Sequence, residues 1–165
     1  MKSAVRAGLA AAGRFDVVWW FFGLLNLLAR CLAEPLHQAS LARRSTADAE
    51  MARRLSSTLT VLHGPFAGMR YATAESAGSA LLPKILGSYE RELQPVVARL
   101  LRRAYTDIVD IGCAEGYYAV GLAMHIDGAR IHAFDTDPVA RQLCRNLADA
   151  NGVGDRLVVA GRCDE

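Results

Sequence analysis

The regular alternation of strand and helix patterns after residue 106 constrains the fold of this chain most strongly. An apolar strand pattern, "DIVDI", runs into a loop with glycines at 112, 116 and 121 and then into an apolar helix pattern, "EGYYAVGLAMHI". The patterns "ARIHAF", "DPVARQLCRNLADAN" and "RLVVAG" continue as strand, helix and strand. Short links between alternating strands and helices predict a parallel sheet, here a doubly wound α/β unit with the spatial strand order 3-2-1.

Local signals support these elements. Asp137 is the expected N-cap of the second helix, with Pro138 at its first position and Gly152 just past its end. Gly128 is expected to end the first helix. The pattern "DIVDI" is expected to be a buried strand.

The glycine loop departs from the dinucleotide pattern G-x-G-x-x-G. Gly112 is followed at the third-glycine position by Tyr117, which would crowd the close helix–strand contact that glycine permits there. The loop reads D-x-G-x-A-x-G instead, from Asp110 through Ala114 to Gly116. Alanine at position 114 predicts ordinary backbone dihedral angles there.

This loop resembles the first motif, D/E-x-G-x-G-x-G, of the class I S-adenosylmethionine (SAM)-dependent methyltransferases, with Ala114 in place of the middle glycine. The resemblance covers about residues 106–165. It implies a Rossmann-like three-layer αβα fold, of which only the first three strands are present, and SAM as the cofactor. N-terminal helices and a short β-hairpin are expected before it.

The resemblance also implies a site. Asp135, at the end of the second strand, would bind both ribose hydroxyls, as a carboxylate that accepts two hydrogen bonds can. Asp164, past the third strand, would bind the adenine amino group. The complete expected cofactor-binding set is Asp110, Gly112, Cys113, Ala114, Gly116, Tyr118, Asp135, Thr136 and Asp164. No catalytic residue is assigned.

The residues themselves give a rationale and leave alternatives open. Gly112 and Gly116 would let a cofactor approach the backbone. An acidic rim of Asp110, Glu115 and Asp135 would suit a positive sulfonium. Asp135 could equally be a turn residue at a strand end, and the tyrosines at 117 and 118 could be core residues.

A second stretch, "GSYERELQP", resembles a segment of the FkbM-type methyltransferases, which carry G-x-Y-E-P-E ahead of a similar loop. With it the resemblance extends over about residues 84–165. This finer resemblance implies transfer to a hydroxyl, with a small-molecule or natural-product acceptor. The matching positions are Gly87, Tyr89, Glu90, Glu92, Tyr117 and Tyr118.

Residues 1–60 are expected to form a basic, helical N-terminal segment. Its stretch 15–33 is strongly apolar and has three interpretations: a helix that packs on the domain or lies in peripheral contact with a membrane surface, a spanning helix, or a signal peptide. Pro35 is expected to open a second helix. The spacing of Met51, Leu55, Leu59 and Leu62 is helical.

Residues 61–80 read as a hairpin and linker, and residues 81–165 as the SAM-binding half-domain. The pattern of 58–73 predicts two short strands around the turn at Gly64 and Pro65. Residues 88–103 read as a helix, with Ser88 as N-cap and a kink or break at Pro95.

Composition and charge give no support for a nucleic-acid-binding protein or for a metal site. The net charge of +2 gives no indication of nucleic-acid binding, although residues 1–70 hold nine Lys/Arg against four Asp/Glu. The four cysteines are scattered without a C-x-x-C pair, which favours a reducing cytoplasm. No cysteine or histidine has a partner at metal-ligand spacing, so no metal site is expected.

The strand patterns stop at the third strand, whereas the class has a seven-stranded sheet. We therefore expect the N-terminal part of a longer enzyme, completed by a missing C-terminal half or an oligomer partner. Two other functions remain open. One is a non-catalytic, membrane-associated or partner-binding protein with a degenerate Rossmann half-domain. The other is a nicotinamide-dependent reductase, which Tyr117 disfavours.

Overall fold

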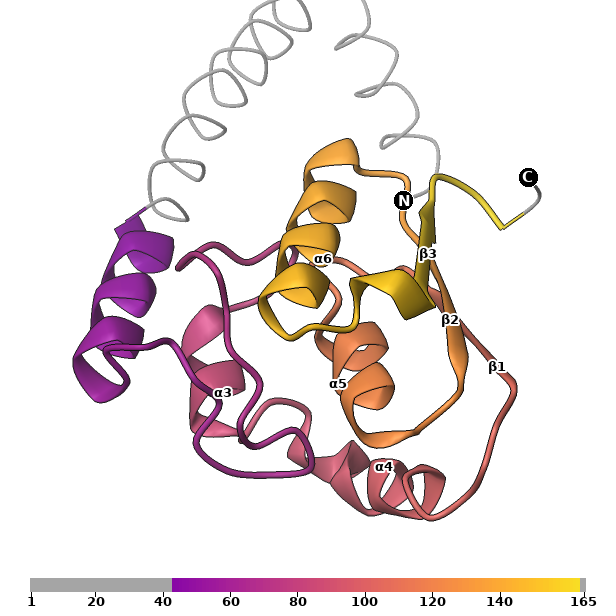
Figure 1. Cartoon of the computed structure of the whole chain (residues 1–165). Coiled ribbons are helices and arrows are strands. Elements are labelled where there is room, and N and C mark those ends of the chain that lie inside the picture. Colours follow the sequence, from indigo (N-terminus) through magenta and orange to yellow (C-terminus); the bar gives the residue numbers. More distant parts are fainter. Residues whose placement is uncertain (1–42, 164–165) are drawn as a thin grey trace, which may run out of the picture. The chain divides into compact units, whose positions relative to one another are not determined.

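Three parallel strands form the sheet of the computed structural model, which describes residues 43–163 (Figure 1). The strands are β1 (Asp107–Ile111), β2 (Arg130–Phe134) and β3 (Leu157–Ala160). Strand β2 lies in the middle, with Asp107 opposite Arg130 and Ile131 opposite Leu157. The predicted strand order and the Rossmann-like α/β fold are therefore confirmed.

The helices follow the predicted alternation and contact one another and the sheet. Asp137 caps α6 as predicted, since its side chain accepts a hydrogen bond from the backbone N–H of Val139. Helix α5 ends at His125, three residues before Gly128, which takes a left-handed turn conformation. The labelled helices are α3 (Leu81–Leu86), η1 (Arg91–Leu93), α4 (Gln94–Leu100), α5 (Tyr117–His125), α6 (Pro138–Ala150) and η2 (Gly154–Arg156).

One face of the sheet is covered and the other is open in the described part of the chain. Helices α5 and α6 lie along one face of the sheet (Figure 1), and Ile131 and Ala133 in β2 are fully buried. On the opposite face, Val109 and Ile111 are 56% and 71% exposed, and Val158 is 46% exposed. The prediction that β1 is a buried strand is therefore wrong for its outward-facing side chains. The described residues show the sheet and one helical layer.

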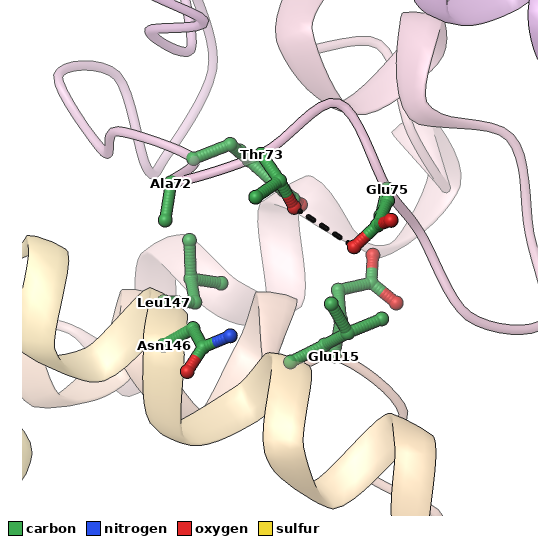
Figure 2. Close-up of a pocket in the computed structure, with 8 residues that line it drawn as sticks. Ala72, Thr73, Glu75, Glu115, Asn146 and Leu147 are labelled. Atoms are coloured by element: carbon green, nitrogen blue, oxygen red, sulfur yellow. Dashed lines mark hydrogen bonds between the residues drawn. The ribbon is translucent and has the colours of Figure 1, made fainter.

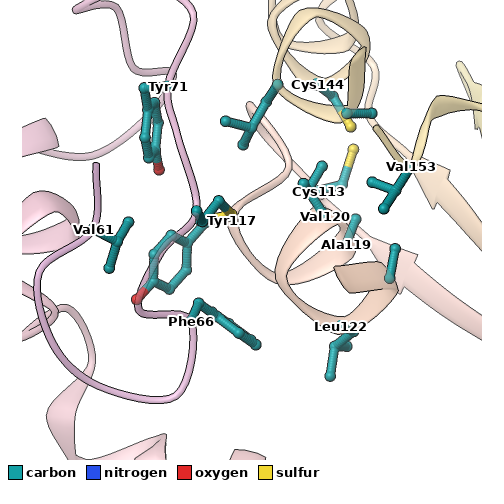
Figure 3. Close-up of a cluster of buried hydrophobic side chains, with 14 of the residues drawn as sticks. Val61, Phe66, Tyr71, Cys113, Tyr117, Ala119, Val120, Leu122, Cys144 and Val153 are labelled. Carbon is teal, nitrogen blue, oxygen red and sulfur yellow. The ribbon is translucent and has the colours of Figure 1, made fainter. Parts of the chain in front are cut away.

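The segment 59–71 packs against α5 as an irregular loop. A single antiparallel bridge, between Thr60 and Arg70, replaces the two predicted strands. Phe66, at the centre of the loop, is fully buried and lies edge-on to Tyr117 at a ring-centroid distance of 5.2 Å (Figure 3). A Cβ atom on Gly121 would lie 2.5 Å from the Phe66 ring, so only glycine fits beneath this ring. The core therefore extends from the sheet unit into residues predicted as hairpin and linker.

The predicted helix over 88–103 is divided and starts later than expected. Glu90 has a left-handed φ of 41°, so the chain cannot be helical at that point. Pro95 lies in the first turn of α4, where its missing N–H costs no hydrogen bond. Ser88 is not an N-cap, since Glu90 precedes η1 and Leu93 precedes α4. The backbone N–H of Ser88 instead donates to the Pro83 carbonyl in the turn after α3.

Residues 43–55 form a further helix, which ends before the predicted apolar positions Leu59 and Leu62. Leu59 has a left-handed φ of 50°, and Met51 and Leu55 are about half exposed. The arginines of this helix are exposed. No helix in 43–163 is long and apolar enough to cross a membrane, and the apolar stretch 15–33 lies outside the described residues.

Candidate cofactor site

The glycine loop folds over the carboxyl end of β2. The backbone N–H groups of Gly112 and Cys113 both donate to the Phe134 carbonyl, at 2.8 and 3.0 Å. The N–H of Gly116 donates to the Cys113 carbonyl at 2.8 Å. Gly112 has a φ of 80°, and no atom of the described residues lies within 4 Å of the position that a Cβ would take there. The described residues therefore leave the loop backbone accessible at Gly112.

Ala114 does not have the ordinary dihedral angles that were expected. Its φ is 49°, in the left-handed region, where any residue other than glycine is strained. This conformation accompanies a hydrogen bond of 2.9 Å from the Ala114 N–H to Asp135 Oδ2. The expectation of ordinary dihedral angles is wrong because alanine can occupy a left-handed turn when the surrounding loop requires one. The rest of the loop imposes that turn.

Replacing Ala114 with glycine should relieve this strain. We expect Ala114→Gly to raise the free energy of unfolding by about 0.5–1 kcal/mol, the strain relieved minus the extra chain entropy of glycine. Urea denaturation measures the change. Ala98→Gly is the matched control, since Ala98 is exposed on a helix and should lose about 1 kcal/mol. Equal losses in both variants would contradict a strained Ala114.

Asp135 follows β2 directly and joins three parts of the site. Its Oδ2 accepts from Ala114, and its Oδ1 accepts from the N–H of Asp137 at 2.9 Å. Its own N–H donates to the Ala160 carbonyl at the end of β3. Each carboxylate oxygen keeps a second lone pair, so the side chain can still accept from a ligand. Asp135 is thus a turn residue by its contacts, and its chemistry leaves the ribose role available.

Asp110 provides a buried acceptor beside this turn. Its Oδ2 atom is buried, and no described residue donates a hydrogen bond to it. Burial raises the pKa of the Asp110 carboxyl above its usual range, a backbone hydrogen bond from Ala119 opposes this rise, and the charge of Asp135 adds to it. A buried oxygen without a donor is costly. A ligand donor, such as an ammonium or hydroxyl group, would satisfy it.

Glu115 is not part of an acidic rim. Its side chain is buried, with 1% of the residue exposed, and forms an ion pair with the equally buried Lys84 of α3. Of the three predicted rim acids, only Asp110 and Asp135 therefore lack such an ion pair among the described residues. No motif pointed to Lys84, although a lysine inside the apolar run "LLPKIL" is the kind of position at which a buried charge needs a partner.

The side chain of Cys113 turns into the core and faces Cys144 of α6 (Figure 3). Contact with Cys144 and burial raise the pKa of the Cys113 thiol, so it is a neutral thiol near pH 7. A Cβ on Gly116 would lie 2.7 Å from Cys144 Sγ. Gly116 therefore provides close packing between the loop and α6, and only the backbone of Cys113 remains for a ligand.

The two motif segments identified in the sequence meet at the start of α5. Tyr118 Oη donates to Glu90 Oε2 at 2.5 Å. Burial raises the pKa of the Tyr118 hydroxyl above its usual value, and this hydrogen bond raises it further. The rings of Tyr89 and Tyr117 lie edge-on at 5.3 Å. Tyr117 is a core residue, whereas Tyr118 is only half buried.

The remaining expected site residues have simpler positions. Thr136 is exposed at the turn after β2, where its carbonyl accepts a hydrogen bond from Arg141. Asp164 lies outside the described residues. Within residues 43–163 no group of His, Cys, Asp and Glu side chains could hold a metal ion.

A small cavity lies between the 71–75 segment and α6 (Figure 2). Its volume of about 10 Å³ is close to that of a single water molecule, so it cannot hold a nucleoside. The hydrogen bond drawn in Figure 2 joins Thr73 to Glu75 and is 3.2 Å long. The lining residues are Tyr71, Ala72, Thr73, Glu75, Glu115, Leu143, Asn146 and Leu147.

Comparisons with known proteins find methyltransferases over a short segment, while no family model matches the chain. The chain is 41% identical over 54 residues to a probable cobalt-precorrin-6B C(15)-methyltransferase (decarboxylating) of Pyrobaculum aerophilum, covering 32% of this chain and 28% of the relative. It is 42% identical over 50 residues to the ribosomal protein L11 methyltransferase of Escherichia coli. It is 40% identical over 50 residues to the release factor glutamine methyltransferase of Chlorobaculum tepidum.

The last two matches each cover 30% of this chain and 17% of the relative. The chain thus spans less than a third of the length of the curated relatives it matches. All three relatives are named as methyltransferases, and each name gives a different methyl acceptor. The comparisons therefore support a methyltransferase in general and identify no acceptor.

Proposed function

We propose that this chain carries the cofactor-binding part of a SAM-dependent methyltransferase. The observation that carries the proposal is the turn in which Asp135, at the end of β2, holds the backbone of Ala114 beside the open face of Gly112. In open α/β sheets, ligands bind outside the carboxyl ends of the strands, which is where this turn lies. The short similarity to methyltransferases is independent support.

The residues present fit SAM in charge and in hydrogen bonding. Asp135 would accept from the ribose hydroxyls with its free lone pairs. The buried Asp110 Oδ2 would gain the donor that it lacks among the described residues. When bound, SAM supplies an electrophilic methyl group on a positive sulfonium, and the two carboxylates favour that charge.

The proposed acceptor is a small molecule or natural product that presents a hydroxyl group. This finer proposal rests on the "GSYERELQP" segment, whose Tyr89 and Glu90 contact the two tyrosines at the start of α5. Methyl transfer requires the acceptor to be aligned with the sulfonium methyl and water to be excluded. None of the residues described above is assigned that task.

Calorimetry on the 165-residue chain tests the proposal with S-adenosylhomocysteine and NADH as probes. We expect S-adenosylhomocysteine to bind and Asp135→Ala to weaken its binding at least tenfold, or about 1.4 kcal/mol. Asp137→Ala is the matched control. It removes the neighbouring carboxylate, which caps α6, and should lower stability by about 1 kcal/mol while leaving affinity unchanged.

Three results would count against the proposal. Binding of NADH in place of S-adenosylhomocysteine would replace it with a nicotinamide-dependent activity. Absence of binding by the unsubstituted chain would leave the half-domain as a scaffold. Equal affinity of Asp135→Ala and the unsubstituted chain would remove the ribose assignment alone.

A further inference from the structure

A buried ion pair connects α3 to the glycine loop across 31 residues of sequence. Lys84 and Glu115 are each 1% exposed, and Lys84 Nζ contacts Glu115 Oε1. Lys84 also donates to Ser76 Oγ at 2.9 Å and lies 5.0 Å from the ring centre of Tyr89. The pair is therefore fixed by several groups from the segment that precedes the sheet.

The Glu115 carboxylate has donors on both oxygens. Oε1 accepts from Ser76 Oγ at 2.9 Å, and Oε2 accepts from the backbone N–H of Ala77 at 3.1 Å. These contacts hold the 76–77 backbone against the loop. The side chain of Glu115 is consequently held by groups from both α3 and the 76–77 segment.

Stabilisation of the fold does not by itself explain why a buried ion pair is present at this position. Two charges lose their hydration on burial, and apolar residues of similar volume often replace a buried pair without loss. The position of the pair suggests another role. Glu115 stands between Ala114 and Gly116, both with left-handed φ values, 49° and 92°. Fixing the side chain at 115 fixes the peptide groups on both sides of it.

We propose that Lys84 and Glu115 are positioning residues that hold the glycine loop in its ligand-ready conformation. The segment 76–89 is then a functional part of the cofactor site. The consequence of this positioning for SAM binding rests on the proposed function.

The test is the double variant Lys84→Met/Glu115→Leu, which removes both charges and keeps apolar volume. Amide hydrogen exchange reports on the loop, because the Ala114 N–H is bonded to Asp135 and the Gly116 N–H to Cys113. We expect a urea midpoint close to that of the unsubstituted chain. Exchange at the two loop amides should be at least tenfold faster while exchange in β2 is unchanged, and S-adenosylhomocysteine should bind at least tenfold more weakly.

Unchanged exchange at the Ala114 and Gly116 amides would overturn the inference, since the pair would then only fill space. The exchange measurement needs no ligand, so it separates this inference from the proposed function. Failure of the unsubstituted chain to bind S-adenosylhomocysteine would overturn the proposed function and leave the exchange result to decide the positioning role.

A second variant keeps the test decisive if the double variant does not fold. Ser76→Ala removes one donor to Glu115 and one acceptor from Lys84 on a partly exposed loop. We expect two- to threefold faster exchange at the loop amides, and no change would overturn the inference. Glu75→Gln is the matched control, because Glu75 bonds to Thr73 and should leave loop exchange unaltered.

Discussion

Replacing Gly87 with alanine is expected to lower the free energy of unfolding by about 3–5 kcal/mol, enough to unfold much of the population. Gly87 ends α3 with a left-handed φ of 75°, and an added Cβ would overlap the backbone carbonyl of His63. The two segments cannot separate freely. Leu62 donates to the Ile85 carbonyl at 2.8 Å, and the Gln94 side chain donates to the Gly87 carbonyl at 2.7 Å.

Gly78 provides the matched control for this substitution. It has the same φ of 75°, and an added Cβ would have no atom of the described residues within 4 Å. Gly78→Ala should therefore carry only the conformational cost, about 1 kcal/mol. Urea denaturation followed by circular dichroism measures both variants. Similar losses at the two positions would show that backbone conformation, and not the overlap with His63, determines the effect.

Lys84→Met is expected to lower the free energy of unfolding by about 3–5 kcal/mol, because it leaves the buried Glu115 carboxylate without its cation. Urea denaturation at pH 7 measures the deficit relative to the unsubstituted chain.

Arg54→Met is the control for removing a cation. Arg54 pairs with Glu50 four residues earlier, and the two side chains are 69% and 62% exposed. Its loss should cost no more than about 0.5 kcal/mol. A Lys84→Met deficit as small as this would contradict an uncompensated buried carboxylate.

The features that could be predicted from sequence are those set by local patterns. The strand order follows from alternating periods and short links, which leave few topologies open. Asp137 and Pro138 begin α6 as predicted because capping depends on neighbouring residues alone. The position of Asp135 at the end of β2 also follows from the local pattern, and the structure adds its hydrogen bond to Ala114. Its ribose-binding role, which the resemblance implies, stays a prediction.

The features that were missed depend on residues distant in sequence. Lys84 and Glu115 come into contact only in the folded chain. From its position in the sequence alone, Glu115 is expected to be an exposed acidic residue of the loop. The left-handed Ala114 is imposed by the surrounding loop and runs against alanine's own preference. The exposure of Val109 and Ile111 depends on which helices cover the sheet, whereas an apolar strand pattern reports only hydrophobicity.

The contact between Phe66 and Gly121 has a consequence for how the sequence can change over time. Because the ring occupies the space of the missing Cβ, any side chain at 121 must be matched by a smaller residue at 66. Either change alone would leave an overlap or a void in the core. Among descendants of a common ancestor, these two positions should therefore be substituted together, so that the 59–71 loop and α5 are constrained to change as a pair.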